Sequence, residues 1–184
     1  MKKILITLAV IIISIFFYVL YIFYSTGFFR DIENTFNGAI ERRIQIPGVE
    51  DLQISYEDHF ILLSSDDRAS RRNGANVQGH LYRIELTDTS FKPVQLTSDF
   101  NSSFFPHGLS MIRVAPGIHK VFVINHVSGK HSIEVFELYK DSLAHVETLR
   151  HHSMISPNDV VAIDENRFYF TNDHGYTEGL GKLG

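Results

Sequence analysis

Beyond residue 48 the chain consists of short strand-like runs separated by turn residues, and this pattern most limits the fold that it can adopt. Alternating or continuous apolar runs of this length are typical of β-strands, and no segment beyond residue 40 keeps a helical period. Pro93 suits an edge strand because proline cannot donate a hydrogen bond to a sheet. The pattern predicts an all-β protein with ten strands: 51–56, 59–64, 80–86, 91–96, 108–114, 120–126, 132–138, 145–149, 159–163 and 167–171.

The predicted strands also repeat. FILLSS, VFVINH and FYFTND begin at residues 60, 121 and 168, and LYRIEL at residue 81 resembles IEVFEL at residue 133. A period of roughly 50 residues with about four strands indicates the blades of a β-propeller. A β-sandwich explains the strands equally well, but not their repeated order.

A propeller blade takes about 45–50 residues, so residues 48–184 would supply about two and a half to three blades, whereas propellers close with about 4–8. We therefore expect an incomplete propeller: either the front part of a longer protein, or a chain whose open blade edges are covered by a partner or by self-association.

Residues 4–24 carry no charged side chain, and about 20 apolar residues suffice to cross a bilayer as a helix. Lys2 and Lys3 precede this run, which predicts a single-pass membrane anchor with the following domain outside the cytoplasm, in the periplasm or the extracellular space. A cleaved signal peptide is the alternative, but its apolar core is shorter, about 7–15 residues. The sequence YSTG at residues 24–27 is also a poor cleavage site.

The predicted domains are a signal-anchor helix at 1–24, a connector at 25–47 and an incomplete propeller at 48–184. In the connector, Phe28, Phe29, Ile32 and Phe36 predict a short helix with an apolar face.

Composition excludes several classes of function. The net charge of −4 and the lack of a basic block argue against nucleic acid as a partner. The chain has no cysteine, which excludes disulfides, thiolate zinc sites and cysteine nucleophiles. The motifs GxSxG and HExxH and a glycine-rich phosphate loop are also missing, so the sequence supports neither the corresponding hydrolases nor a nucleotide site.

Oxygen donors occur in pairs at two predicted strand starts, Glu50-Asp51 and Asn158-Asp159. Because neighbouring strand residues point to opposite faces, each pair is expected to serve two different sites. Calcium takes six to eight oxygen ligands, often carboxylate and amide together. The alternative for residues 157–159 is a simple turn.

Most of the ten histidines fall within residues 104–175, and His107 and His126 each lie at the end of a predicted strand. A histidine pair can relay a proton from water because imidazole titrates near neutral pH. Alternatively, each histidine fills a hydrogen-bonding position at a strand end.

Taken in order, several segments resemble motifs of the paraoxonase/arylesterase family: GVEDLQI, FPHGLS, VFVINH followed by SIEVFEL, HVETLRH, SPNDVVAI and RFYFTNDHGY. The resemblance covers about residues 45–178. It implies a six-bladed β-propeller with two calcium ions in its central tunnel, and hydrolysis of aryl esters and lactones. Many members keep an uncleaved hydrophobic N-terminus, in agreement with the predicted anchor.

By this resemblance, Glu50 and Asn158 would bind the catalytic calcium ion. Asp51 and Asp159 would bind the structural calcium ion, with help from the backbone carbonyl of Leu109. The family's remaining ligands for the catalytic calcium come from later blades, and two side chains are too few for the shell that calcium usually takes. The disulfide between the first and last strands of vertebrate members cannot form here.

The resemblance also assigns a histidine dyad. His107 would deprotonate a water molecule and His126 would support it, while calcium polarises the ester carbonyl and stabilises the oxyanion. Asp173 matches an acidic position of the family and would orient His126.

Three functions follow as hypotheses. The first is a membrane-anchored, calcium-dependent hydrolase whose substrate is a small aryl ester or lactone. The second is a catalytically inactive, membrane-anchored propeller remnant that acts as a binding or interaction module. A sugar-lactonase-type propeller is the third, and the PHGLS and SPNDVVAI motifs fit it poorly.

Overall fold

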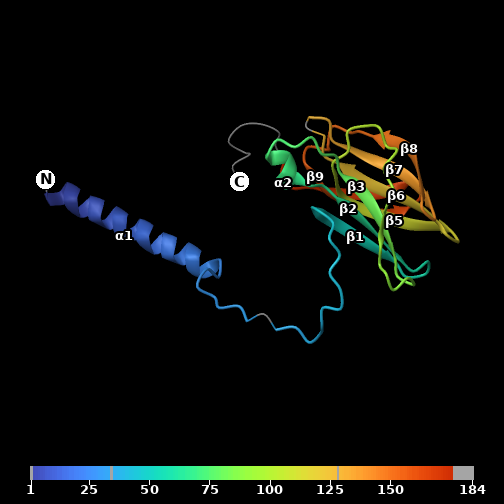
Figure 1. Ribbon diagram of the computed structural model, residues 1–184. Coiled ribbons are helices and arrows are strands. Elements are labelled where there is room, and N and C mark those ends of the chain that lie inside the picture. The colour runs from blue at the N-terminus through green and yellow to red at the C-terminus, as the bar shows by residue number, and fades with distance from the viewer. Residues whose placement is uncertain (1, 34, 128, 176–184) are drawn as a thin grey trace. The chain divides into compact units, whose positions relative to one another are not determined.

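A computed structural model describes residues 2–33, 35–127 and 129–175. The chain divides into two units, Met1–Arg43 and Ile44–Gly184, and Figure 1 shows their helices and strands. The first unit contains α1 (Lys2–Ser25), a helix of 24 residues in which no side chain is buried. At a rise of 1.5 Å per residue it is about 36 Å long, and a bilayer core is about 30 Å thick.

Within the described residues, α1 is the one helix that is long and apolar enough to cross a membrane, and an N-terminal signal sequence would have the same features. Its threonine and serine hydroxyls are satisfied within the helix. The hydroxyls of Thr7 and Ser14 donate to the carbonyls of Lys3 and Val10, at 3.0 and 2.9 Å. The apolar N-terminal helix expected from the sequence is therefore present.

Gly27 ends α1 with a positive φ of 71°. The N–H of Phe28 bonds to the Phe23 carbonyl at 2.9 Å and that of Gly27 to the Tyr24 carbonyl at 3.1 Å, the pattern of a Schellman cap. The Phe28 ring packs on Phe23 at 4.7 Å between centroids. The predicted helix over residues 28–36 is wrong, because this cap turns the chain and the residues described after it form no helix.

The second unit contains ten described strands in three antiparallel sheets, so the mostly-β class is confirmed. The first sheet contains β1 (Val49–Ser55), β2 (Phe60–Ser65), β3 (His80–Glu85) and β4 (Pro93–Gln95). The second sheet contains β5 (Pro106–Ala115), β6 (Ile118–Asn125), β7 (Ser132–Tyr139) and β8 (Ser142–Leu149), and the hairpin contains β9 (Pro157–Asp164) and β10 (Arg167–Asn172). In each sheet the strands lie in chain order.

Each predicted strand corresponds to one of these ten, and Pro93 lies in an edge strand as expected. The sequence repeat marks equivalent strands: FILLSS, VFVINH and FYFTND fall on β2, β6 and β10, the second strand of each sheet. One element was not predicted. A short helix, α2 (Arg68–Arg72), occupies part of the expected polar loop after β2, with Asp67 as its N-cap.

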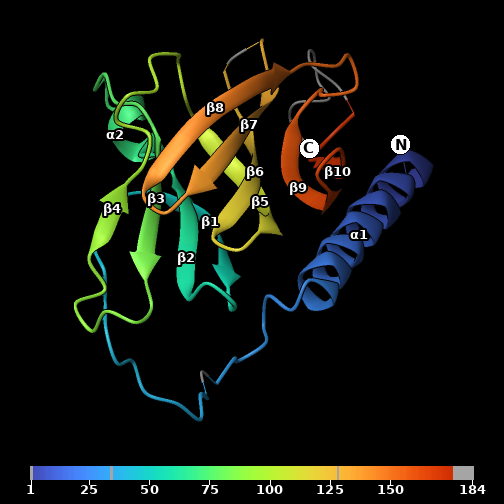
Figure 2. The same cartoon turned by 90° about the vertical axis from the view of Figure 1, so that its right-hand side faces the viewer.

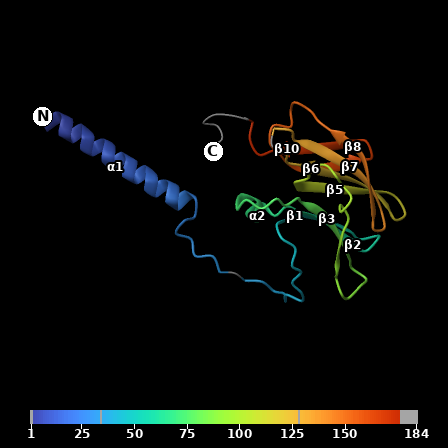
Figure 3. The same ribbon diagram turned by 45° about the horizontal axis from the view of Figure 1, so that its top comes forward.

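The second sheet lies between the first sheet and the hairpin, because β5 contacts β1 and β2 as well as β9. Figure 2 shows the β9–β10 hairpin beside the second sheet, and Figure 3 shows that sheet above the first one. β1, β5 and β9 are the first strands of their sheets. They are neighbours in space, with β5 in the middle, because β5 contacts both β1 and β9.

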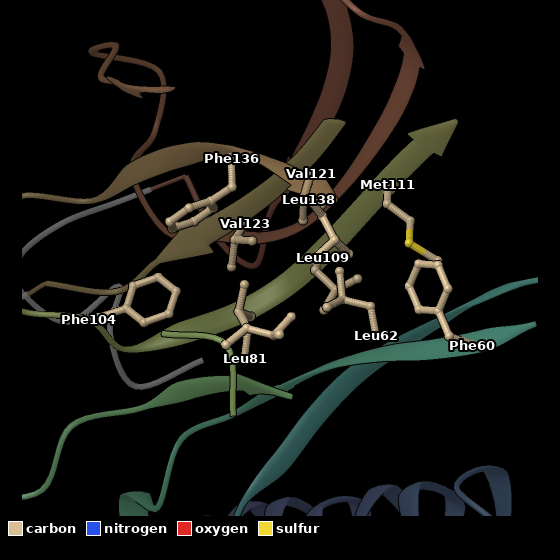
Figure 4. Packing of buried hydrophobic residues seen from close by; sticks show 11 residues of the cluster. Phe60, Leu62, Leu81, Phe104, Leu109, Met111, Val121, Val123, Phe136 and Leu138 are labelled. Atoms are coloured by element: carbon tan, nitrogen blue, oxygen red, sulfur yellow. The ribbon is translucent and has the colours of Figure 1, made fainter. Parts of the chain in front are cut away.

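The two faces of the second sheet pack into different clusters, since alternate residues of β6 point opposite ways. Val121 and Val123 face the first sheet, where the cluster also holds Phe60, Leu62, Leu81, Phe104, Leu109, Met111, Phe136 and Leu138 (Figure 4). Phe122 and Ile124 face the hairpin and meet Val160 and Phe168. Burial on both faces explains why residues 121–124 of β6 are continuously apolar.

Candidate functional site

Three strand irregularities bring the predicted site residues together. The pairing of β1 with β2 shifts between Val49 and Asp51, which makes Glu50 an extra residue. Similar shifts place His107 and Gly108 in a bulge of β5, and Asn158 and Asp159 in a bulge of β9. A bulge re-aims side chains at the end of a pairing. All three bulges lie at the start of the first strand of a sheet, and those three strands are neighbours.

These bulges line one small pocket of about 190 Å³. Its lining residues are Glu50, Asp51, His107, Gly108, Asn158 and Asp159. The sequence pattern predicted that adjacent donors such as Glu50 and Asp51 would face different sites. The β1 bulge breaks this alternation, so both residues reach the pocket, and their assignment to two different ions stays a prediction.

His107 is at the centre of the polar contacts. Its Nδ1 lies 3.0 Å from Glu50 Oε2 and 3.0 Å from Nη2 of Arg68, and its Nε2 lies 2.8 Å from Oδ1 of Asn158. Arginine can only donate. Where Arg68 donates to Nδ1, the proton of a neutral His107 is on Nε2 and is donated to Asn158. The Glu50 carboxylate can only accept, so it is matched instead by the form of His107 that carries a proton on Nδ1.

The two aspartates are held by backbone groups instead. Asp51 accepts from the N–H of Leu52 at 2.7 Å and from that of Leu109 at 2.8 Å. Asp159 accepts from the N–H of Val160 at 2.8 Å. Leu109 therefore contacts the site through its N–H; the predicted role of its carbonyl as a metal ligand stays a prediction.

Gly108 allows β5 and β9 to approach each other closely. A Cβ at this position would lie 2.6 Å from the carbonyl oxygen of Asn158 and 2.7 and 2.8 Å from Cα and Oδ1 of Asp159. These distances are shorter than real Cβ contacts. The pocket in this form thus requires a glycine beside the two donors of β9.

His126 lies beside His107, with ring centroids 5.0 Å apart and rings nearly perpendicular. Its Nε2 donates to the Pro157 carbonyl at 2.5 Å, and its backbone N–H donates to the Phe105 carbonyl at 3.0 Å. Burial lowers the pKa of His126 to about 4. His126 is therefore neutral at pH 7 and is fixed between two strand ends.

Asp173 is exposed, and its backbone N–H donates to the Ser156 carbonyl at 2.9 Å. In the part of the chain that the structure describes, no hydrogen bond joins its carboxylate to His126. The orienting role expected from the family resemblance stays a prediction.

Residues 43–182 match the family model described as arylesterase, which is most of the chain. The chain belongs to the arylesterase family. The expected resemblance to this family is confirmed.

Curated members of the arylesterase family show the extent of the likeness. Serum paraoxonase/arylesterase 2 of Gallus gallus is 37% identical over 101 residues, which cover 52% of this chain and 28% of that protein. The Bos taurus protein of the same name is 31% identical over 105 residues, 54% of this chain and 30% of that protein. Serum paraoxonase/lactonase 3 of Homo sapiens is 27% identical over 107 residues, which cover 55% of this chain and 30% of that protein. The chain thus covers less than a third of the length of these relatives.

The calcium implied by the arylesterase family can be tested against the donor set of the pocket. Glu50, Asp51, Asn158 and Asp159 offer carboxylate and amide oxygens only, which are the ligands that calcium prefers. No group of three His, Asp or Glu side chains in the described ranges has the spacing of a metal site. The four side chains are of the type that binds calcium, but they are too few to supply the six to eight oxygen ligands that calcium takes.

Two residues that the sequence did not single out also contact the site. Arg68 reaches Glu50 and His107, and its only sequence signal is its position just after the end of β2 in SSDDR. The ring of His131 lies 5.0 Å from that of His126. Nothing in its sequence context distinguishes His131 from the other histidines.

Proposed function

We propose that this member of the arylesterase family is a calcium-dependent hydrolase of small aryl esters and lactones, anchored in a membrane by residues 4–24 with residues 48–184 outside the cytoplasm. The observation that carries the proposal is the single pocket formed by the starts of β1, β5 and β9. The names of the relatives, paraoxonase/arylesterase and paraoxonase/lactonase, support the two substrate classes.

The three sheets are, in this proposal, consecutive parts of a six-bladed propeller. In a propeller the sheets radiate from a central channel, and the adjacent first strands β1, β5 and β9 are in the order that innermost strands would have. The pocket would then lie on the channel, where further blades of a complete propeller could add ligands. Two calcium ions are expected there.

Glu50 and Asn158 would hold the catalytic calcium ion, and Asp51 and Asp159 the structural one. When bound, calcium would polarise the ester carbonyl and stabilise the negative charge that develops on its oxygen. The carboxylates present oxygens to the pocket, and Asn158 also fixes the His107 ring through Nε2.

His107 would accept the proton of a water molecule that attacks the carbonyl carbon. His126 would act as a positioning residue: it is held by the Pro157 carbonyl and presents its ring to that of His107. Because the pKa of His126 is about 4, His126 adds no positive charge beside the base at neutral pH.

The test is hydrolysis of phenyl acetate and of a lactone by the full chain, with calcium and with EDTA. We expect calcium-dependent turnover. His107→Gln should lower turnover by about 10²–10⁴-fold, the usual contribution of a general base, whereas His152→Gln, at an exposed site, should leave it unchanged. Turnover that persists in EDTA, or that survives His107→Gln, would refute the mechanism.

One observation favours the alternative, an inactive interaction module. On one face of the β9–β10 hairpin, the apolar residues Val161, Ile163 and Tyr169 are 52%, 51% and 71% exposed to solvent. The other face packs against the second sheet. Such an apolar face suits contact with a second sheet, which could come from another copy of the chain. Sedimentation of a concentration-dependent oligomer that neither binds calcium nor hydrolyses esters would favour this alternative.

A further inference from the structure

Arg68 brings a permanent positive charge to the edge of a pocket whose lining includes the acids Glu50, Asp51 and Asp159. Its Nε lies 3.3 Å from Glu50 Oε1 and 3.4 Å from Asp66 Oδ2. Its Nη2 lies 3.0 Å from Nδ1 of His107. One guanidinium therefore contacts a proposed calcium ligand and the proposed general base together.

The local fold fixes this position. The buried Asp66 donates its N–H to the Gly48 carbonyl at 2.8 Å, which ties the end of β2 to the start of β1. Asp67 caps α2 by accepting from the N–H of Ser70 at 3.0 Å. Arg68 is the first residue of α2 and so lies opposite Glu50.

The charges of the pocket are balanced unequally. Asp51 and Asp159 accept hydrogen bonds from backbone N–H groups. In contrast, Glu50 faces the side chains of Arg68 and His107. Of the described acids in the pocket, Glu50 is the one whose charge is balanced by an arginine, and a divalent cation would neutralise the same carboxylate.

We propose that Arg68 is a built-in counter-cation of the pocket, which holds Glu50 in the metal-free state and releases it when a calcium ion binds. The inference rests on the calcium site proposed above. Glu50 cannot give its full charge to both cations, and a guanidinium close to a calcium ion is repelled by it. Binding of calcium therefore includes the cost of separating Arg68 from Glu50.

Asp66 provides the place to which Arg68 withdraws. Its carboxylate already lies within 3.4 Å of Arg68 Nε and is paired with Arg71, whose Nη2 lies 2.8 Å from Oδ2. A small movement toward Asp66 would break the contacts with Glu50 and with Nδ1 of His107. The second loss matters for catalysis, because it frees the Nδ1 lone pair of the proposed base.

The test is calcium titration of the full chain in detergent micelles, by calorimetry and by the shift in melting temperature. Arg68→Gln keeps hydrogen-bond donors but removes the charge, and Arg72→Gln, exposed on the same helix, is the matched control. We expect Arg68→Gln to bind calcium about tenfold more tightly, as the loss of a partly exposed competing ion pair would give. Without calcium, Arg68→Gln should have a lower melting temperature than the unmodified chain. Calcium should raise the melting temperature of Arg68→Gln by more than it raises that of the unmodified chain.

In the double variant Glu50→Gln/Arg68→Gln, removal of the Arg68 charge should no longer tighten calcium binding relative to Glu50→Gln alone, since Arg68 competes with calcium for Glu50. Nuclear magnetic resonance of the unmodified chain gives a readout that does not depend on a variant folding: calcium should shift the Arg68 Nε–H signal and leave that of Arg83 in place. An unmoved Arg68 signal at saturating calcium would overturn the inference.

The outcomes separate this inference from the calcium site itself. If the unmodified chain binds calcium and Arg68→Gln binds it equally or more weakly, Arg68 is not a competitor, although the calcium site stands. If only Arg68→Gln binds calcium, the counter-cation is supported in its strongest form. If neither binds, both the calcium site and the role of Arg68 are refuted.

Discussion

At the scale of single residues, the pocket depends on the missing side chain of Gly108. Gly108→Ala places a Cβ within 2.6–2.8 Å of Asn158 and Asp159, so β5 and β9 must move apart. We expect a loss of about 1–3 kcal/mol in the free energy of unfolding, the usual cost of overpacking, together with weaker calcium binding. Urea unfolding and calorimetry would measure both effects.

Gly175→Ala is the matched control for this substitution, because a Cβ there meets no atom of the described residues within 4 Å. It should unfold and bind calcium like the unmodified chain. Equal stability of the two alanine variants would mean that the close approach of β5 and β9 is not needed.

The lowered pKa of His126 predicts a pH dependence of stability. Its pKa is about 4 in the folded protein and about 6.5 when unfolded, so between these values the unfolded chain binds the extra proton. Stability should therefore fall as the pH is lowered from about 6.5 to 4, by about 1–3 kcal/mol from this residue. Urea unfolding in EDTA at several pH values would measure this slope.

His126→Gln should reduce that slope by about one proton, and His152→Gln, at an exposed position, should not change it. Part of the slope should remain, because burial also lowers the pKa values of His80, His119 and His131. An unchanged slope in His126→Gln would show that the residue is not buried as a neutral ring.

At the scale of elements, stability should follow the faces of the first sheet. Leu62 of β2 is fully buried against the second sheet, whereas Leu52 of β1 is 53% exposed. Leu62→Ala should cost about 2–5 kcal/mol, because it removes buried methyl groups and leaves a cavity. Leu52→Ala should cost less than about 1 kcal/mol. Similar losses in urea unfolding would mean that the two sheets do not share one core.

The strands could be predicted from the sequence because apolar runs and turn residues are local signals. α2 could not, because its five residues carry no apolar period and its cap at Asp67 resembles an ordinary polar loop. The predicted helix at residues 28–36 failed for the opposite reason: an apolar period was present, but the Gly27 cap had already turned the chain.

The composition of the site could be anticipated, but not its geometry. Alternation assigns Glu50 and Asp51 to opposite faces, and only the pairing with β2 reveals the bulge that brings both into one pocket. The register of this pairing depends on the residues of β2, so the alternation within β1 alone does not contain it. The contacts of Arg68 with Glu50 and His107 join three segments and were hidden for the same reason.

At the scale of the whole molecule, α1 should decide where the chain resides. The full chain should stay with membranes during alkaline carbonate extraction. The double variant Ile11→Lys/Ile15→Lys should be released from the membrane fraction, because each lysine at the centre of a membrane helix raises the free energy of insertion by about 2.5–3.5 kcal/mol. The control variant Val146→Lys/Val161→Lys, at two positions that are exposed on strands, should stay in the membrane fraction. Retention of the α1 variant would rule out a simple membrane span.

The order of the strands has a kinetic consequence. Every described strand pairs with the strand that precedes or follows it in the chain, so each sheet can form from hairpins as the polypeptide leaves the ribosome, with little loop entropy to overcome. The pocket is different, since it needs the starts of three successive sheets. It can be assembled only after β9 has docked, and ligand capture would therefore report that all three described sheets have come together.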